Sequence, residues 1–166
     1  MGKTIKLSNE NYLDTSSIMH NSKKLNEYLN FKGNTLKCGL ENNQNFTNQT
    51  LKKVNFNKYL NNNFNNDYEN NFKLNDGCIE IMSDYIKCVI VVVSLQFNGF
   101  TDGYVYITKK NVGRFATIEN YGGGVTATAI IPVSKGDKIF AEIYAAGDGA
   151  VSNWADATFV EVVAIW

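Results

Sequence analysis

Residues that commonly perform catalysis are sparse in this sequence of 166 residues. His20 is the one histidine, and it stands in a polar N-terminal stretch where a solvated or packing role is expected. Cys38, Cys78 and Cys88 cannot all pair within one chain, and none has CxxC spacing. Because no cluster of His, Cys and carboxylates is present, we expect no enzymatic activity and no transition metal. The cysteines are expected to be small buried hydrophobes in a reducing compartment.

Asp148 and Asp156 are the carboxylates whose positions could hold a cation. Both belong to a predicted glycine-containing connection, and they could face each other across it. Carboxylate oxygens are ligands that calcium accepts in proteins. Solvated turn aspartates are the alternative interpretation, so calcium is retained as an optional ligand and no other cofactor is expected.

A second group of loop residues predicts a ligand site of another kind. Tyr121, Tyr144, Asn153 and Trp154 lie in or beside glycine-containing connections. Exposed aromatic rings stack on sugar rings, and amide groups hydrogen bond to sugar hydroxyls, so this combination favours carbohydrate binding. For Trp154 there is an equal alternative, in which the ring plugs the mouth of the fold.

β-Strands are expected to position these loops. Segment 125–146 alternates in hydropathy on both sides of residues 135–138, KGDK, which predicts two strands joined as a β-hairpin. Residues 86–97 form a run of β-branched side chains typical of a central strand buried on both faces. Residues 158–166 predict a last strand that is apolar on both faces, and therefore central in its sheet or at a subunit interface.

The remaining pattern predicts the fold class and the division of the chain. Further short strands are expected at 78–82, 104–108 and 114–119, with turns at 75–77 and 109–113. About seven to nine such strands without helical periodicity favour an all-β, antiparallel jelly-roll sandwich as a head domain over residues 51–166. Residues 1–50 are polar and predict a mostly irregular attachment or linker segment. It includes one mini-helix capped by Asn21 or Ser22.

Charge and hydropathy argue against two classes of partner, nucleic acids and the membrane interior. Lys plus Arg equal Asp plus Glu at 16 each, and a net charge of zero argues against nucleic-acid binding. The longest apolar run, residues 88–93, is far shorter than the about 20 residues of a membrane helix, so we expect no membrane insertion. The N-terminus lacks the apolar region of a signal peptide, so we expect synthesis in the cytoplasm.

Residues 52–166 resemble the C1q and tumour-necrosis-factor family of trimeric jelly rolls. The segments that carry the resemblance are VNFN at 54–57, FKLNDGCIEI at 72–81, CVIVVVSLQF at 88–97, DGYVYITKKNVG at 102–113, IPVSKGDKIFAEIYAA at 131–146 and TFVEVVAI at 158–165. The resemblance implies a homotrimer whose apolar strand faces meet along a threefold axis, with apical loops available for binding. The interface it implies comprises Val160, Val162, Ala164, Trp166, Tyr104 and Tyr106.

Residues 4–30, TIKLSNENYLDTSSIMHNSKKLNEYLN, are similar to N-terminal segments of tail-fibre, baseplate and minor structural proteins in phages and prophages of Gram-positive bacteria. This similarity implies that residues 1–50 dock on virion tail or baseplate proteins. The function it favours is a non-catalytic trimeric head at the virion surface that binds a bacterial surface polysaccharide or another host receptor. The alternatives are a virion decoration or connector protein with a purely structural, trimerising role, and a C1q-like head on a bacterial spore or cell surface.

Overall fold

The structure is a computed structural model that describes residues 4–6, 12–14, 35–60, 70–99, 102–120 and 123–165. The chain divides into two compact units, Met1–Phe31 and Lys32–Trp166. In the first unit, β1 (Thr4–Lys6) pairs antiparallel with β2 (Tyr12–Asp14). The mini-helix expected after Asn21 lies outside the described residues.

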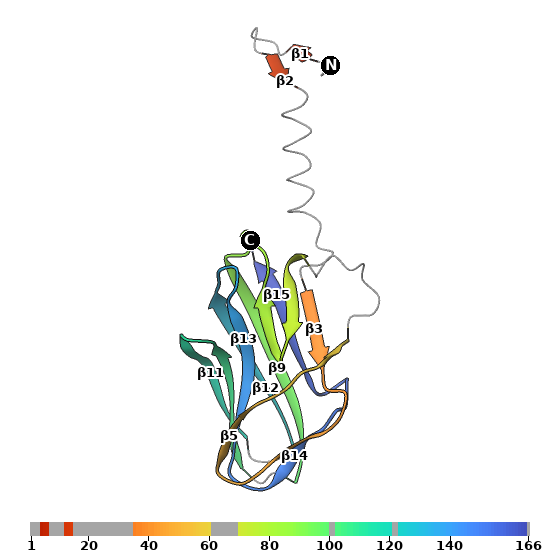
Figure 1. The fold of residues 1–166 in the computed structure, drawn as a ribbon, viewed down its shortest axis with the longest axis vertical. Coiled ribbons are helices and arrows are strands. Elements are labelled where there is room, and N and C mark those ends of the chain that lie inside the picture. Colours follow the sequence, from red (N-terminus) through yellow and green to blue (C-terminus); the bar gives the residue numbers. More distant parts are fainter. Residues whose placement is uncertain are drawn as a thin grey trace. The chain divides into compact units, whose positions relative to one another are not determined.

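The second unit is a sandwich of two antiparallel sheets (Figure 1). The β9 sheet has the order β4-β14-β9-β15-β3-β6, and β12 also pairs with β9. Its strands are β3 (Thr35–Gly39), β4 (Gln44–Phe46), β6 (Lys58–Tyr59), β9 (Cys88–Asn98), β12 (Gly124–Pro132), β14 (Gly149–Val151) and β15 (Phe159–Ile165). The antiparallel jelly roll expected from the sequence is therefore confirmed.

The opposing β13 sheet has the order β11-β10-β13-β8-β7, and β5 also pairs with β13. Its strands are β5 (Thr50–Lys53), β7 (Phe72–Asn75), β8 (Cys78–Ile81), β10 (Gly103–Lys109), β11 (Gly113–Asn120) and β13 (Lys138–Ala145). The predicted hairpin around residues 109–113 is observed, because β10 pairs with β11. A β-bulge between Ile107 and Thr108 shifts their register.

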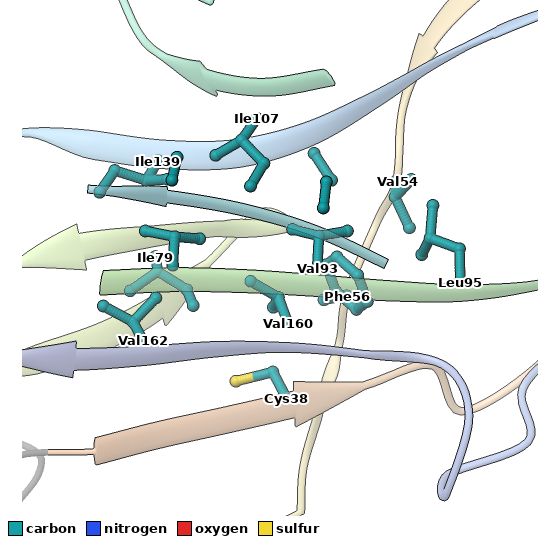
Figure 2. Close-up of a cluster of buried hydrophobic side chains, with 14 of the residues drawn as sticks. Cys38, Val54, Phe56, Ile79, Val93, Leu95, Ile107, Ile139, Val160 and Val162 are labelled. Atoms are coloured by element: carbon teal, nitrogen blue, oxygen red, sulfur yellow. The ribbon is translucent and has the colours of Figure 1, made fainter. Parts of the chain in front are cut away.

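The core lies between the sheets, and alternate residues of each strand supply it (Figure 2). Side chains of successive strand residues point to opposite faces, so one face of each strand is buried. In β9 and β13 the residues with at most 2% exposure are Val89, Val91, Val93, Leu95, Ile139, Ala141, Ile143 and Ala145. These branched and small side chains pack closely on a pleated surface, which explains why the alternating pattern forms strands here.

Two strands expected to form a hairpin belong to different sheets. Residues 125–146 do form two strands, but β12 pairs with β9 whereas β13 pairs with β10, β8 and β5. The connection at residues 133–137 therefore carries the chain from one sheet to the other, and the predicted β-hairpin is wrong. Alternation indicates which side chains face the core, but it does not specify which strand supplies the backbone hydrogen bonds.

The expected boundary at residue 50 also differs from the structure. β3 and β4 are strands of the β9 sheet, and Leu36, Cys38 and Phe46 are at most 1% exposed. The predicted attachment or linker segment over residues 1–50 is therefore part of the sandwich from Thr35 onward. These strands are only five and three residues long, so their apolar positions are too few to produce a sustained period.

Candidate functional site

The loop between β14 and β15 holds Asn153 and Trp154. The Asn153 side-chain amide donates to the backbone oxygen of Glu41 at 3.0 Å, and its backbone N–H donates to Oδ1 of Asn43 at 2.8 Å. The Trp154 ring is 64% exposed, so it does not plug the fold. The amide of Asn153 is thus engaged in fixing the loop, while the indole faces solvent. Tyr121 lies outside the described residues.

Tyr144 lies on a different surface, the outward face of the β13 sheet. Strand β10 pairs with β13 so that Tyr104 stands directly opposite Tyr144. Their ring centroids are 6.4 Å apart, and the Tyr104 ring also stacks on Tyr106 at 6.2 Å with an interplanar angle of 19°. We call these three residues the tyrosine platform. A shallow depression beside Tyr104 and Tyr144 is also lined by Asp102 and Phe97.

Charged groups surround the tyrosine platform. The Arg114 guanidinium lies 3.6 Å from the centroid of the Tyr106 ring, a favourable cation–π contact. The Tyr104 hydroxyl donates to Oε1 of Glu119 at 3.3 Å. The negative charge of Glu119, followed by this hydrogen bond, raises the pKa of Tyr104 above its ordinary value, so the phenol remains protonated at neutral pH.

Val160, Val162 and Ala164 do not form an exposed interface. All three are buried within their own chain, at 2%, 0% and 8% exposure. They point into the core because the β15 side chains alternate, and the prediction placed them on the wrong face of the strand. The structure also separates them from Tyr104 and Tyr106, which lie on the outward face of the opposite sheet. Trp166 lies outside the described residues.

The opposite side of the β9 sheet carries an exposed apolar surface. In one row across three strands, Ile130 of β12 stands opposite Ile90 of β9, which stands opposite Val163 of β15. Ile130 is 65% exposed and Ile165 is 38% exposed, while Ile90, Val92 and Val163 are half-buried. We call these five residues the apolar face. The continuous apolar run of β9 is the sequence signal for this face. The sequence predicted burial of both faces of that strand, whereas Ile90 and Val92 on its outward face are only half-buried.

The cysteines differ in their environment. Cys38 is fully buried, and burial raises the pKa of its thiol to about 12, which leaves it unreactive. Cys78 is also buried, whereas Cys88 is half-buried and stands opposite Ile165 and Pro132 beside the apolar face. The expectation that all three are buried thus holds for two of them.

The aspartates predicted for calcium are not assembled into a metal centre. Asp148 uses Oδ1 to accept the backbone N–H of Asn48 at 2.7 Å, which fixes the turn before β5. Asp156 is exposed in the loop before β15. Among the residues that the structure describes, no group of three or more His, Cys, Asp or Glu side chains could hold a metal ion.

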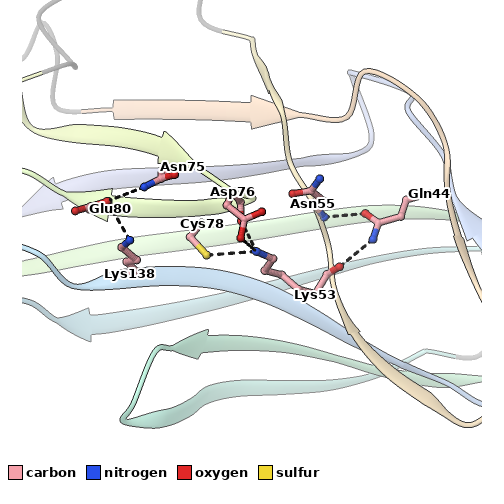
Figure 3. Close-up of polar contacts among 8 residues, drawn as sticks. All are labelled: Gln44, Lys53, Asn55, Asn75, Asp76, Cys78, Glu80 and Lys138. Carbon is pink, nitrogen blue, oxygen red and sulfur yellow. Dashed lines mark hydrogen bonds and ion pairs between the residues drawn. The ribbon is translucent and has the colours of Figure 1, made fainter.

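A set of polar contacts joins β5 to the β7–β8 hairpin (Figure 3). The Lys53 ammonium donates to the backbone oxygen of Asp76, lies 2.9 Å from its Oδ2, and approaches Sγ of Cys78 at 3.8 Å. Glu80 accepts a hydrogen bond from Nδ2 of Asn75 at 3.3 Å and lies 3.4 Å from Nζ of Lys138. These contacts bridge strands of one sheet, so we assign them a structural role.

A further ion pair fixes the connection between the sheets. Nζ of Lys109 lies 2.6 Å from Oδ2 of Asp137 and donates to the backbone oxygen of Pro132 at 2.9 Å. Asp137 also accepts the backbone N–H of Ser134 at 2.8 Å. Burial alone would raise the pKa of Asp137, but the hydrogen bonds from Lys109 and Ser134 outweigh it and lower the pKa below its ordinary value.

Comparison with known proteins shows the fold of this chain. No protein family and no curated protein matches the sequence. Among solved structures, it is similar to murine APRIL, with a TM-score of 0.62 and 10% identity over 79% of this chain and 98% of that one. Eiger TNF from S. frugiperda gives a TM-score of 0.56 and 12% identity over 80% and 92% of the two chains. Rabbit GITRL gives a TM-score of 0.51 and 17% identity over 80% of this chain and 93% of that one.

These likenesses define the class of the fold, which is a jelly roll of the tumour-necrosis-factor type. At such low identities they do not identify a ligand. Among the residues that the structure describes, no helix is long and apolar enough to cross a membrane.

Proposed function

We propose that this chain is the subunit of a non-catalytic homotrimeric head that attaches a phage or prophage particle to a bacterial surface polysaccharide. The apolar face is the observation that carries this proposal. One side of an antiparallel sheet commonly faces water and is then polar, yet here Ile130, Ile90 and Val163 form an apolar row. Contiguous exposed apolar surface of this kind is typical of a protein interface.

Further copies of the same chain are the occupant that we propose for the apolar face. The sequence resemblance to the C1q and tumour-necrosis-factor family implies threefold assembly, and the fold is of that type. Closed rotational symmetry satisfies such a surface on every subunit at once. Three identical heads also gain avidity when each binds a repeating surface polymer weakly.

The two ends of the sandwich suit different roles. Strand β3 begins at Thr35, which stands opposite Val163 near the C-terminal end of β15 (Figure 1). Trp154, Tyr104 and Tyr144 lie toward the other end, where β9 finishes. In this proposal residues 1–31 dock on virion tail or baseplate proteins, and the end of the sandwich that carries Trp154, Tyr104 and Tyr144 meets the host. The place of action that we propose is the virion surface, after synthesis in a bacterial cytoplasm.

Oligomeric state tests the proposed assembly. We expect light scattering to give three times the chain mass for the wild type and one chain mass for Ile130→Glu. Burying an isoleucine contributes about 1.5–3 kcal/mol, and an interfacial carboxylate adds a desolvation cost at each of three interfaces. Val112→Glu is the matched control, because Val112 is 64% exposed in the β10–β11 turn. A monomeric wild type, or equal effects of both variants, would contradict the proposal.

Alkylation of Cys88 provides an independent measurement. This thiol lies beside the apolar face and is half-buried in a single chain. We expect it to be protected in the wild-type assembly and to react faster in Ile130→Glu. Equal rates in the two proteins would show that the apolar face is not covered by other copies.

Truncation separates the proposed head from a connector. Removing residues 1–31 leaves the second compact unit intact. A recognition head retains its binding to host cells after this truncation, whereas a purely structural connector shows no such binding in either form. Absence of retention of the wild-type trimer on host cells or cell walls would favour the connector.

A further inference from the structure

The proposed trimer does not cover the tyrosine platform. It lies on the β13 sheet, whereas the apolar face lies on the β9 sheet, on the opposite side of the sandwich. Trimerisation through the apolar face would therefore not require the platform. Tyr104 is 37% exposed and Tyr144 is half-buried, so ring surface is accessible on the folded chain.

We infer that the tyrosine platform binds a neutral glycan, with sugar rings stacked on Tyr104 and Tyr144 and sugar hydroxyls bonded to the neighbouring carboxylates. This inference rests on the proposed function and assigns its ligand class and location. It differs from the sequence-based expectation, in which Asn153 and Trp154 shared one site with Tyr144.

The geometry of the rings is the first argument. The cross-strand pair Tyr104–Tyr144 and the along-strand pair Tyr104–Tyr106 have centroids separated by 6.4 and 6.2 Å. The rings of Tyr104 and Tyr144 therefore form the accessible aromatic surface, held by backbone pairing between β10 and β13, while the Tyr106 ring is only 9% exposed and stacks on Tyr104. Because each ring is carried by a paired strand, little conformational freedom remains to be lost on binding.

The polar groups beside the rings are the second argument. Glu119 already accepts the Tyr104 hydroxyl, and Glu142 accepts the Thr108 hydroxyl at 2.7 Å. Each carboxylate has further acceptor sites, which suit the hydroxyl donors of a sugar. Asn153, in contrast, uses its side-chain amide to hold the segment around Glu41.

The charge distribution is the third argument, and it selects a neutral ligand. Asp102 and Glu119 are the carboxylates nearest to Tyr104, and both of their charges act on its hydroxyl. The guanidinium of Arg114 is engaged over the Tyr106 ring. The charges of Asp102 and Glu119 would repel an anionic polymer such as a teichoic acid or a nucleic acid, so we expect it to be excluded.

A glycan array carrying neutral hexose and N-acetylhexosamine oligosaccharides, with teichoic acid as the anionic probe, tests the inference on the full-length trimer. We expect the wild type to bind neutral probes and Tyr104→Ala and Tyr144→Ala to raise the half-saturating concentration at least tenfold. Tyr104→Phe keeps the ring and should stay within threefold of the wild type. Tyr85→Ala is the matched control, because Tyr85 is 62% exposed in the connection between β8 and β9.

The outcomes distinguish the inference from the proposed function. Undiminished binding by both alanine variants, or loss of binding in Trp154→Ala instead, overturns the inference and leaves the recognition head in place. Binding of teichoic acid alone also overturns it. A trimer that binds neither the array nor host cells overturns the inference and the recognition function together. Should an alanine variant fail to form the trimer, Tyr144→Leu retains an apolar strand residue without the ring and is expected to give the same loss.

Discussion

Replacing Gly77 by alanine is expected to destabilise the sandwich through a close backbone contact. Gly77 follows Asp76 in the two-residue turn between β7 and β8, and φ is +49° at Asp76 and +67° at Gly77. The Asn-Asp-Gly signal in the sequence predicted this turn, because glycine adopts positive φ without steric cost. A Cβ at position 77 would lie 2.6 Å from Oδ1 of Asn55 and 2.9 Å from its Cα.

The magnitude is the sum of two effects. The left-handed backbone conformation costs an L-residue about 1–2 kcal/mol. Relieving an overpacked contact with backbone costs about a further 1–3 kcal/mol, so Gly77→Ala should lower the free energy of unfolding by about 2–5 kcal/mol. Gly136→Ala is the matched control, because φ is +88° there and nothing lies within 4 Å of the added Cβ. It should show only the first effect, about 1–2 kcal/mol.

Urea denaturation at one protein concentration measures the difference between the two variants. Combining Gly77→Ala with Asn55→Ala removes the contact with Oδ1 but retains the contact with Cα at 2.9 Å, so only partial recovery is expected. Equal losses in Gly77→Ala and Gly136→Ala would refute the reasoning, because the segment around Asn55 would then not approach the turn as the structure shows.

Three other predictions follow from burial and charge. Val162→Glu should abolish folding because the side chain is fully buried, whereas Val163→Glu should fold as a monomer; circular dichroism and light scattering separate these results. Asp137→Asn should lower stability at neutral pH by about 1–2 kcal/mol. Because the folded pKa of Asp137 is depressed, its contribution is present above the unfolded value of about 4 and is lost as pH falls through the folded value, so the variant should show a shallower acid transition. In the monomeric Ile130→Glu variant a thiol reagent should leave Cys38 unmodified and should react first with Cys88, and an equal rate at both would show that the sandwich opens readily.

The candidate site was predicted only in part. Tyr144 was selected from its position near a glycine-containing loop, but its neighbours in the structure are Tyr104 and Tyr106, which the sequence assigned to a trimer interface. Tyr104 and Tyr144 are forty positions apart in the chain, and antiparallel pairing of β10 with β13 places them side by side. Asn153 and Trp154 lie in the connection between β14 and β15 instead.

Local sequence patterns indicated the class of the fold and the central strands. The β-branched run predicted β9, and the two apolar faces of residues 158–166 predicted a last strand that is central in its sheet or at a subunit interface. The structure places β15 between β9 and β3. Period-two alternation and turn residues act over a few positions, so they are readable without any partner.

Contacts between distant segments determine which strands pair and which face of each strand is outward. They place β12 and β13 in different sheets and β3 beside β15. They also turn Val160 toward the core. A shift of one residue in register moves every side chain of a strand to the other face of its sheet. When both faces of the strand are apolar, the local sequence does not indicate which face is buried. The surfaces available for assembly and for binding are therefore properties of the packed sheets.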